Sequence, residues 1–146
     1  MEPRFLLDTN ICIYIRRQRP PEVLARFQRL RSGEAVISVI TYGELRYGAE
    51  KSQFREQAAA QLSELSSLLP VMDLPLQAGE AYGAIRAKLE IKGEMIGNND
   101  LWIAAHAMAA GSRGNAKAKP RLLSIWANAG SSRASRSPVQ SKLQSA

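Results

Sequence analysis

The chain has 146 residues, 45% of them apolar, which is enough for one hydrophobic core and too little for two ordinary domains. Its single cysteine, Cys12, excludes an internal disulfide, fits a reducing compartment and is expected to be a small buried side chain. No apolar run approaches the length of a membrane span, and charged residues near the N-terminus argue against a signal peptide. We therefore expect a cytoplasmic protein that does not bind a membrane.

The formal net charge of +7 comes entirely from one end of the chain. Residues 1–110 hold 13 Lys/Arg and 13 Asp/Glu, whereas residues 111–146 hold 7 Lys/Arg and no acid. One basic cluster nevertheless follows Asp8 closely, with Glu22 as its sole acid: Arg16, Arg17, Arg19, Arg26, Arg29 and Arg31. This cluster is either a phosphate-binding surface or a solvated helix face with a Glu22–Arg26 pair.

Strand-like and helical segments alternate along the first 110 residues. Short apolar runs predict buried strands over residues 4–7, 35–39 and 71–74. Apolar spacing, with prolines at helix starts and glycines at helix ends, predicts six helices: 10–16, 22–31, a helix that carries Glu44 and ends near 50, 53–69, 75–92, and one from Asn98 or Asn99 to about 110. Ser38 or Thr41 is the expected cap of the third helix. This alternation predicts an α/β fold with a central parallel sheet.

Three carboxylates, Asp8, Glu44 and Asp100, each stand where an apolar run passes into a helical pattern. Because the C-terminal ends of parallel strands converge on one crevice, we expect the fold to bring these side chains together. Carboxylates crowded in this way raise each other's pKa unless a cation lies between them. Oxygen ligands of this kind suit Mg2+, with Mn2+ as the alternative. The pattern therefore predicts metal-dependent chemistry on phosphodiesters.

Each candidate residue is expected to have its own role at this site. Asp8 and Asp100 would bind the metal directly, and Glu44 would complete the acidic pocket. Thr9 or Asn10 would hydrogen-bond an Asp8 oxygen and thereby orient it.

The same carboxylates also have structural interpretations that involve no metal. Asp8 could accept N–H bonds at a helix start, and Asp100 could be a first-turn acid favoured by the helix dipole. Glu44 could form an ion pair with Arg46 or Arg86.

Other chemically active side chains have more ordinary interpretations. His106 lies about 240° around the helix from Asp100, at 100° per residue, so we expect a capped or surface histidine and not a ligand. Trp102, Tyr42 and Tyr47 could stack on bases, although apolar packing is the commoner use of such residues.

Three motifs together resemble the PIN-domain ribonuclease toxins of the VapC type: L-L-D-T-N-I at 6–11, I-S-V-I-T-Y-G-E-L-R-Y-G-A at 37–49 and I-G-N-N-D-L-W-I-A-A-H-A at 96–107. The resemblance covers about residues 4–110. It implies a three-layer α/β/α PIN-like domain, Mg2+-dependent endoribonuclease activity through metal-activated water, an RNA substrate and a cognate antitoxin. Asp8, Glu44 and Asp100 match the family's acidic residues, and Thr9 and Asn10 match its polar pair.

The resemblance ends near Gly111. Family members usually continue with a strand, a T-N-[ND] turn and R-E-F-x-R-V-P-G, none of which can be read in residues 112–146. We therefore expect a nuclease domain over residues 1–111 whose last strand or strands are missing or replaced. Residues 112–146 are expected to be a basic, low-complexity, disordered tail, in which the run 122–126 would add a strand or be prone to aggregate.

A frameshift near Gly111 offers one explanation for this tail. Synonymous codons GCC GGG AGT TCG CGC GCG TCC CGG for residues 129–136, read two bases later, encode R-E-F-A-R-V-P. We therefore hypothesise that the tail is out-of-frame translation. A natural tail that diverges from the family is the alternative.

Three functions from different classes follow from these residues. The leading one is a Mg2+-dependent endoribonuclease toxin, and the second is a catalytically impaired remnant that binds antitoxin or RNA without cleaving. A phosphatase with Asp8 as covalent nucleophile ranks last, because Asn10 stands where such enzymes carry a second aspartate. We also expect a homodimer, since the helices over 53–69 and 75–92 carry more apolar surface than a small sheet needs.

Overall fold

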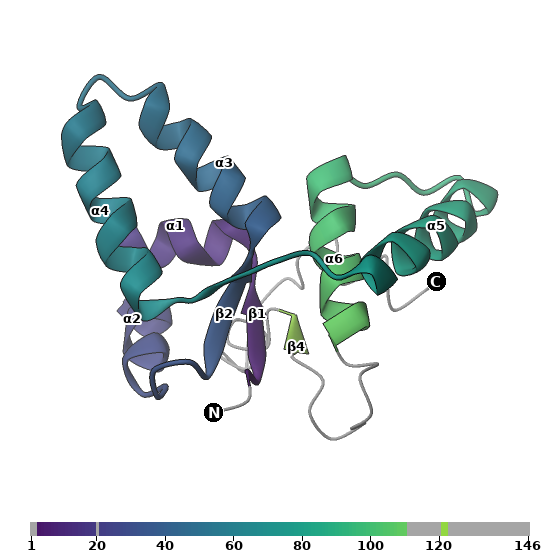
Figure 1. The fold of residues 1–146 in the computed structure, drawn as a ribbon, viewed down its shortest axis with the longest axis horizontal. Helices are drawn as coiled ribbons and strands as arrows, with labels where there is room; N and C mark the ends of the chain where they lie inside the picture. Colours follow the sequence, from purple (N-terminus) through teal and green to yellow (C-terminus); the bar gives the residue numbers. More distant parts are fainter. Residues whose placement is uncertain (1–2, 20, 111–120, 123–146) are drawn as a thin grey trace.

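The structure, a computed structural model, describes residues 3–19, 21–110 and 121–122. Its sheet has four strands in the order β3-β2-β1-β4, and every neighbouring pair is parallel (Figure 1). The strands are β1 (Phe5–Leu7), β2 (Ala35–Ser38), β3 (Val71–Met72) and β4 (Arg121–Leu122). The helices are α1 (Thr9–Arg17), α2 (Pro21–Gln28), α3 (Val39–Glu50), α4 (Arg55–Leu68), α5 (Leu76–Ile91) and α6 (Asn98–Ala110).

The side chains of β1 and β2 alternate between the two faces of the sheet, as the two-residue period of a strand requires. Leu7 and Ile37 belong to a core cluster with buried residues of α1, α2, α3 and α4. Leu6 and Val36 point the other way and pack against Ile103 of α6. Helix α5 packs in turn against α6. The predicted three-layer α/β/α arrangement is therefore confirmed.

Polar side chains at the starts of α3 and α6 have different roles. Ser38, one of the two predicted caps, lies at the N-cap of α3, and its Oγ accepts the N–H of Ile40 at 3.1 Å. Thr41 lies within the first turn and has no hydrogen-bond partner for its buried hydroxyl within the described residues. Helix α6 begins at Asn98, whose side-chain Oδ1 accepts a hydrogen bond from the Tyr82 hydroxyl at 2.8 Å. Asn98 therefore joins α6 to α5.

Helix α2 is shorter than predicted, because it ends at Gln28 and not at Arg31. The next two N–H groups donate to carbonyls three residues earlier, at 3.2 and 3.0 Å, which tightens the chain into a last turn. The Glu34 carboxylate then accepts the Arg31 N–H at 2.9 Å and the Arg4 guanidinium at 2.7 Å. These bonds direct the chain into β2.

Strand β4 lies beside β1, with Phe5 opposite Arg121 and Leu6 opposite Leu122. It overlaps the start of the run 122–126, for which a strand was one of the two expectations. Three predictions lie outside the described residues. They are the domain boundary at residue 111, the disorder of the rest of the tail, and the frameshift hypothesis for residues 129–136. Among the helices that are described, none combines the length and apolar character needed to cross a membrane.

Candidate active site

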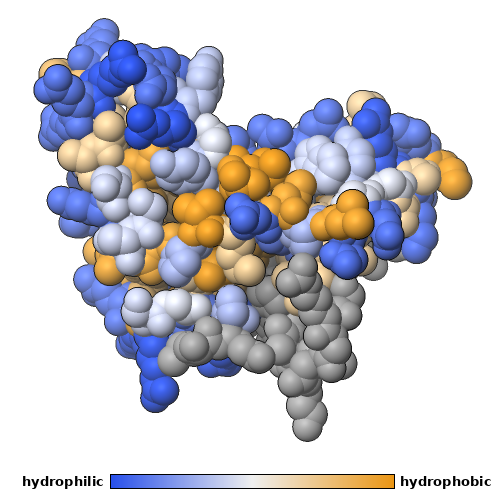
Figure 2. All heavy atoms as spheres, in the orientation of Figure 1, coloured by the Kyte–Doolittle hydropathy of each residue, from blue (hydrophilic) through white to orange (hydrophobic). Residues whose placement is uncertain are grey.

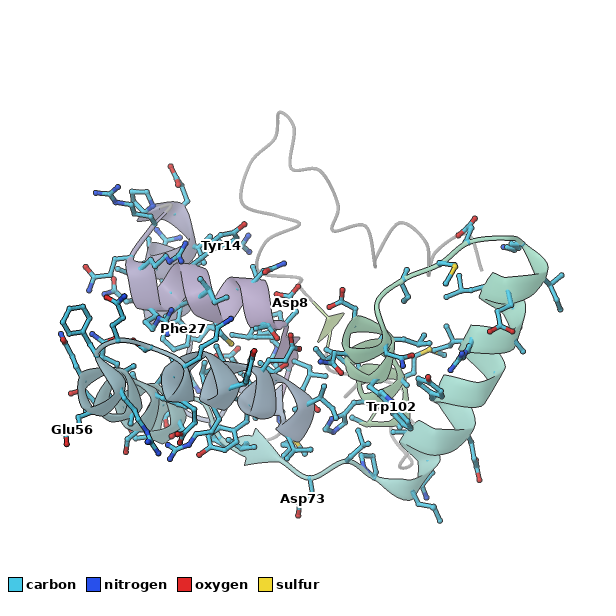
Figure 3. All side chains as sticks on the ribbon, turned by 90° about the horizontal axis from the view of Figure 1, so that it is seen from above. Asp8, Tyr14, Phe27, Glu56, Asp73 and Trp102 are labelled. Carbon is cyan, nitrogen blue, oxygen red and sulfur yellow. The ribbon has the colours of Figure 1, made fainter. Side chains whose placement is uncertain are left out.

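The three predicted carboxylates lie around the C-terminal ends of the central strands. Asp8 immediately follows β1, Glu44 lies in α3 directly after β2, and Asp100 lies in the first turn of α6. Figure 3 shows Asp8 at the end of α1 that faces α6. Residues that are 36 and 56 positions apart in the sequence thus lie toward the same edge of the sheet, and the charges of Glu44 and Asp100 both act on Asp8.

Asp8 is the N-cap of α1, so its structural interpretation is confirmed, and its metal-binding role stays a prediction. Its backbone is extended, with φ −81° and ψ 172°, and its Oδ1 accepts the Ile11 N–H at 2.9 Å. This bond holds the carboxylate at the end of β1 in one orientation. Capping and metal binding are compatible, because a carboxylate has two oxygens and several lone pairs.

The electrostatics of Asp8 show that the carboxylates are close enough to interact. Burial raises the pKa of Asp8 to about 6, against the opposing effect of the Ile11 N–H bond. The negative charges of Asp100 and Glu44 contribute to the same rise. Burial also raises the pKa of Asp100. The fold therefore gathers negative charge in a half-buried place, where a cation would be stabilised.

Thr9 has a different partner from the one predicted. Its hydroxyl donates a hydrogen bond to Oε1 of Glu44 at 3.0 Å, and not to Asp8. Asn10 is exposed and contributes its backbone N–H to the stabilisation of the Asp8 carboxylate. Two successive residues at the start of α1 therefore act on two different carboxylates.

The arginines considered as partners of Glu44 bind elsewhere. Arg46 pairs with Glu50 at 3.3 Å, and Arg86 pairs with Glu90 at 3.1 Å. Within residues 3–19 and 21–110, neither arginine neutralises the Glu44 carboxylate. The ion-pair interpretation of Glu44 is therefore wrong for both arginines.

His106 is buried, so the expectation of a capped or surface histidine is wrong. Only 1% of its surface is exposed, and its Nδ1 lies 2.8 Å from Ser38 Oγ. Burial lowers the pKa of His106, which keeps the imidazole neutral. The flanking Ala105 and Ala107, both buried, were the sequence signal for this position.

The aromatic residues named as possible base-stacking groups mostly pack within the protein. Trp102 stacks on Tyr82, with ring centroids 4.0 Å apart and an interplanar angle of 14°. Tyr42 packs against the core cluster beside α1 and α4. Tyr47 is 65% exposed, and its ring lies 4.8 Å from the Lys51 ammonium. The packing interpretation therefore holds for Trp102 and Tyr42.

The ligands that the site offers are all oxygens. Cys12 and His106 are both fully buried, and His106 is already bonded to Ser38. Among the described residues, no three carboxylate, histidine or cysteine side chains are close enough to enclose an ion by themselves. A metal site at Asp8, Glu44 and Asp100 therefore stays a prediction, and an ion there would have to keep part of its water shell.

Comparison with known proteins places this arrangement in a family. The family model of the PIN domain matches residues 5–113 of this chain. Ribonuclease VapC2 of Haemophilus influenzae is 42% identical over 108 residues, which are 74% of this chain and 81% of that protein. The tRNA(fMet)-specific endonuclease VapC of Shigella flexneri shows the same identity and coverage. The crystal structure of DNA-bound VapBC from Salmonella typhimurium has a TM-score of 0.70 and 41% identity, over 75% of this chain and 82% of that one.

These matches cover the part of the chain that carries the site. Residues 5–113 include all three motifs and every element from β1 to α6. The sequence comparison and the fold comparison both lead to proteins of the VapC type. The chain therefore belongs to the PIN-domain ribonuclease toxins of the VapC type.

Proposed function

We propose that this protein is a Mg2+-dependent endoribonuclease, with Mn2+ as an alternative ion, and the toxin of a toxin–antitoxin pair. The observation that carries the proposal is the Asp8 carboxyl at the end of β1, whose pKa of about 6 is raised by burial and by the charges of Asp100 and Glu44. Such crowding is unfavourable in the ionised form, and a divalent cation reverses that effect.

Asp8 and Asp100 would bind the ion directly, and Glu44 would complete the site. A bound Mg2+ lowers the pKa of water and offsets the charge that builds up on the leaving oxygen. The chain itself holds the ligands in place. The Ile11 N–H orients Asp8, and the Thr9 hydroxyl orients Glu44. Because Mg2+ retains several waters, it does not need three side chains that already enclose it.

Three kinds of partner belong to this proposal. Initiator tRNA is the first RNA substrate to test, because one relative at 42% identity is a tRNA(fMet)-specific endonuclease. A cognate antitoxin is expected because the Salmonella relative is a VapBC complex. Figure 2 shows apolar residues over the middle of one face, between the α3–α4 pair and α5. An exposed apolar surface of this kind suits binding of the antitoxin or of a second copy of the chain in the expected homodimer. We place both interactions in the cytoplasm.

Cleavage of purified tRNA tests the proposed activity. The wild-type chain should cut initiator tRNA in Mg2+ or Mn2+ and leave it intact in EDTA. Asp8→Asn should abolish cutting, whereas Glu56→Gln should cut at the wild-type rate. Glu56 is an exposed carboxylate on α4, well away from Asp8 in Figure 3. Wild-type cleavage by Asp8→Asn would show that the proposed mechanism is wrong.

A catalytically impaired remnant is the second candidate. No acidic residue follows Asp100 in the sequence, and the family match ends at residue 113. A remnant would bind its antitoxin or tRNA and would cut no RNA with any divalent ion. Antitoxin binding without cleavage, in a protein that is folded by circular dichroism, would favour this function.

A further inference from the structure

A small group of buried polar side chains lies on or beside the helices that carry Glu44 and Asp100. Of the described polar residues, Ser38, Thr41 and His106 are almost completely inaccessible to solvent. Ser38 and Thr41 lie at the start of α3, which carries Glu44, and His106 lies in α6, which carries Asp100. The 2.8 Å contact between His106 Nδ1 and Ser38 Oγ therefore connects the two helices that bear these acids.

The donor in this contact depends on the tautomer of His106, and the Ser38 hydroxyl can be that donor. Ser38 Oγ already accepts the Ile40 N–H at 3.1 Å, so its own proton can donate to Nδ1 of His106. This requires a neutral imidazole, and burial lowers the pKa of His106 accordingly. Breaking a hydrogen bond in such surroundings leaves buried polar atoms unpaired, which is unfavourable. The bond therefore holds the two helices in a defined relationship.

The bond joins the N-cap of α3 to the second half of α6. Ser38 precedes Glu44 by six residues, and His106 follows Asp100 by six residues. Six residues correspond to about 9 Å along a helix. Both carboxylates thus extend from the same connection by similar lengths. Any change in the angle or register at the connection alters the separation between Glu44 and Asp100.

Helix α6 also makes aliphatic contacts with strands β1 and β2. Ile103 and Ala107 pack against Leu6 and Val36. Such contacts contribute stability, but they are non-directional and tolerate small shifts of one helix along another. A hydrogen bond between defined atoms restricts those shifts.

We propose that His106 is a positioning residue, which acts through Ser38 to set the separation of Glu44 and Asp100 for the metal. The inference rests on the proposed metal site. It concerns the geometry of that site, and His106 itself touches neither the ion nor the RNA.

Metal affinity gives the first test, with Mn2+ as the probe and electron paramagnetic resonance to count the free ion. His106→Leu removes the polar ring and should weaken Mn2+ binding about tenfold or more, as loss of outer-shell partners does. His106→Asn places a polar atom near the Nδ1 position and should restore most of the affinity. Ile103→Val trims the same interface and should lower Tm while Mn2+ affinity stays at the wild-type value.

A distance measurement without metal gives the second test. Nitroxide labels at Tyr47→Cys on α3 and Asn99→Cys on α6 would report the separation of the helices, and both positions are exposed. The native Cys12 is buried, and burial raises the pKa of its thiol, so it should not react. His106→Leu should shift or broaden the distance distribution, whereas His106→Asn and Ile103→Val should retain it.

The two measurements separate the inference from the proposed function. An unchanged distribution and unchanged Mn2+ affinity in His106→Leu would overturn the positioning role, as would an equal loss of affinity in Ile103→Val. If the distribution shifts while the wild-type chain binds no Mn2+, the metal proposal fails and the control of helix separation stands. Should His106→Leu not fold, His106→Gln, which places its polar end near Nε2, replaces it with the same expected shift.

Discussion

The Thr9 hydroxyl donates a hydrogen bond to the Glu44 carboxylate at 3.0 Å, and so joins the first residue of α1 to the middle of α3. Its neighbour Asp8 ends β1 and caps the same helix. Asp8 therefore supplies one carboxylate, and the adjacent Thr9 orients the carboxylate of Glu44. A polar residue next to the first aspartate thus acts on the second acid of the site.

Removal of the Thr9 hydroxyl should impair catalysis more than stability. Thr9→Val keeps the shape of the side chain, and we expect cleavage to slow about tenfold or more because Glu44 loses its orienting donor. Thr9→Ser keeps the donor and should cut at close to the wild-type rate. Single-turnover cleavage measures the effect, and Tm serves as the control for folding. Equal rates for the valine variant and the wild type would show that the bond has no catalytic role.

Asp8→Asn should have opposite effects on activity and stability. Asparagine caps a helix as well as aspartate does, so the bond from Ile11 should survive. The variant removes a buried charge that Asp100 and Glu44 repel. We expect higher resistance to urea at pH 7 without metal, by up to about 3 kcal/mol, together with loss of cleavage. Lower stability than wild type under these conditions would contradict the electrostatic argument.

The pH dependence of stability should show the same effect in the wild type. The pKa of Asp8 is higher in the folded chain, at about 6, than its ordinary value of 3.8. The folded state then binds more protons, so the contribution of Asp8 is greatest below pH 3.8 and is lost as pH rises through 6. Urea unfolding of wild type and Asp8→Asn at pH 4.5 and 7, without metal, isolates this contribution. The stability difference between the two proteins should widen at pH 7 in favour of the variant.

A divalent ion should stabilise the folded chain at neutral pH. At a hundred times its Kd, Mg2+ or Mn2+ would add about 2.7 kcal/mol to the free energy of unfolding. The gain should be smaller at pH 5, because protons compete with the ion for Asp8. Thermal unfolding with and without EDTA measures it. Asp8→Asn should show little gain, and an equal gain in that variant would place the ion elsewhere.

The frameshift hypothesis has a direct test in the gene sequence. If the tail is out-of-frame translation, the codons for residues 129–136 should encode R-E-F-A-R-V-P when read two bases later. Codons that cannot produce this peptide would support a natural, family-divergent tail. A corrected reading frame, if found, would then provide the chain on which the cleavage assay should be repeated.

The sequence by itself determined the order of strands and helices over residues 4–110, the parallel sheet and the family. It also identified Asp8, Glu44 and Asp100 as the candidate site residues. Apolar periodicity and residues at helix ends report on each segment separately, and motifs of the VapC type are contiguous. The end of α2 at Gln28 could not be predicted from the sequence, because Glu34 accepts the Arg31 N–H only after the chain has turned into β2.

Only the tertiary structure decided which side chains meet across the site. Periodicity placed His106 on a helix face, but the packing of α6 against β2 buried it beside Ser38. Likewise, the sequence predicted a hydrogen bond from Thr9 or Asn10 to Asp8, and the relative position of α1 and α3 directs the Thr9 hydroxyl to Glu44 instead. Contacts between segments distant in the chain depend on the register and angle of packed elements, which no local pattern encodes.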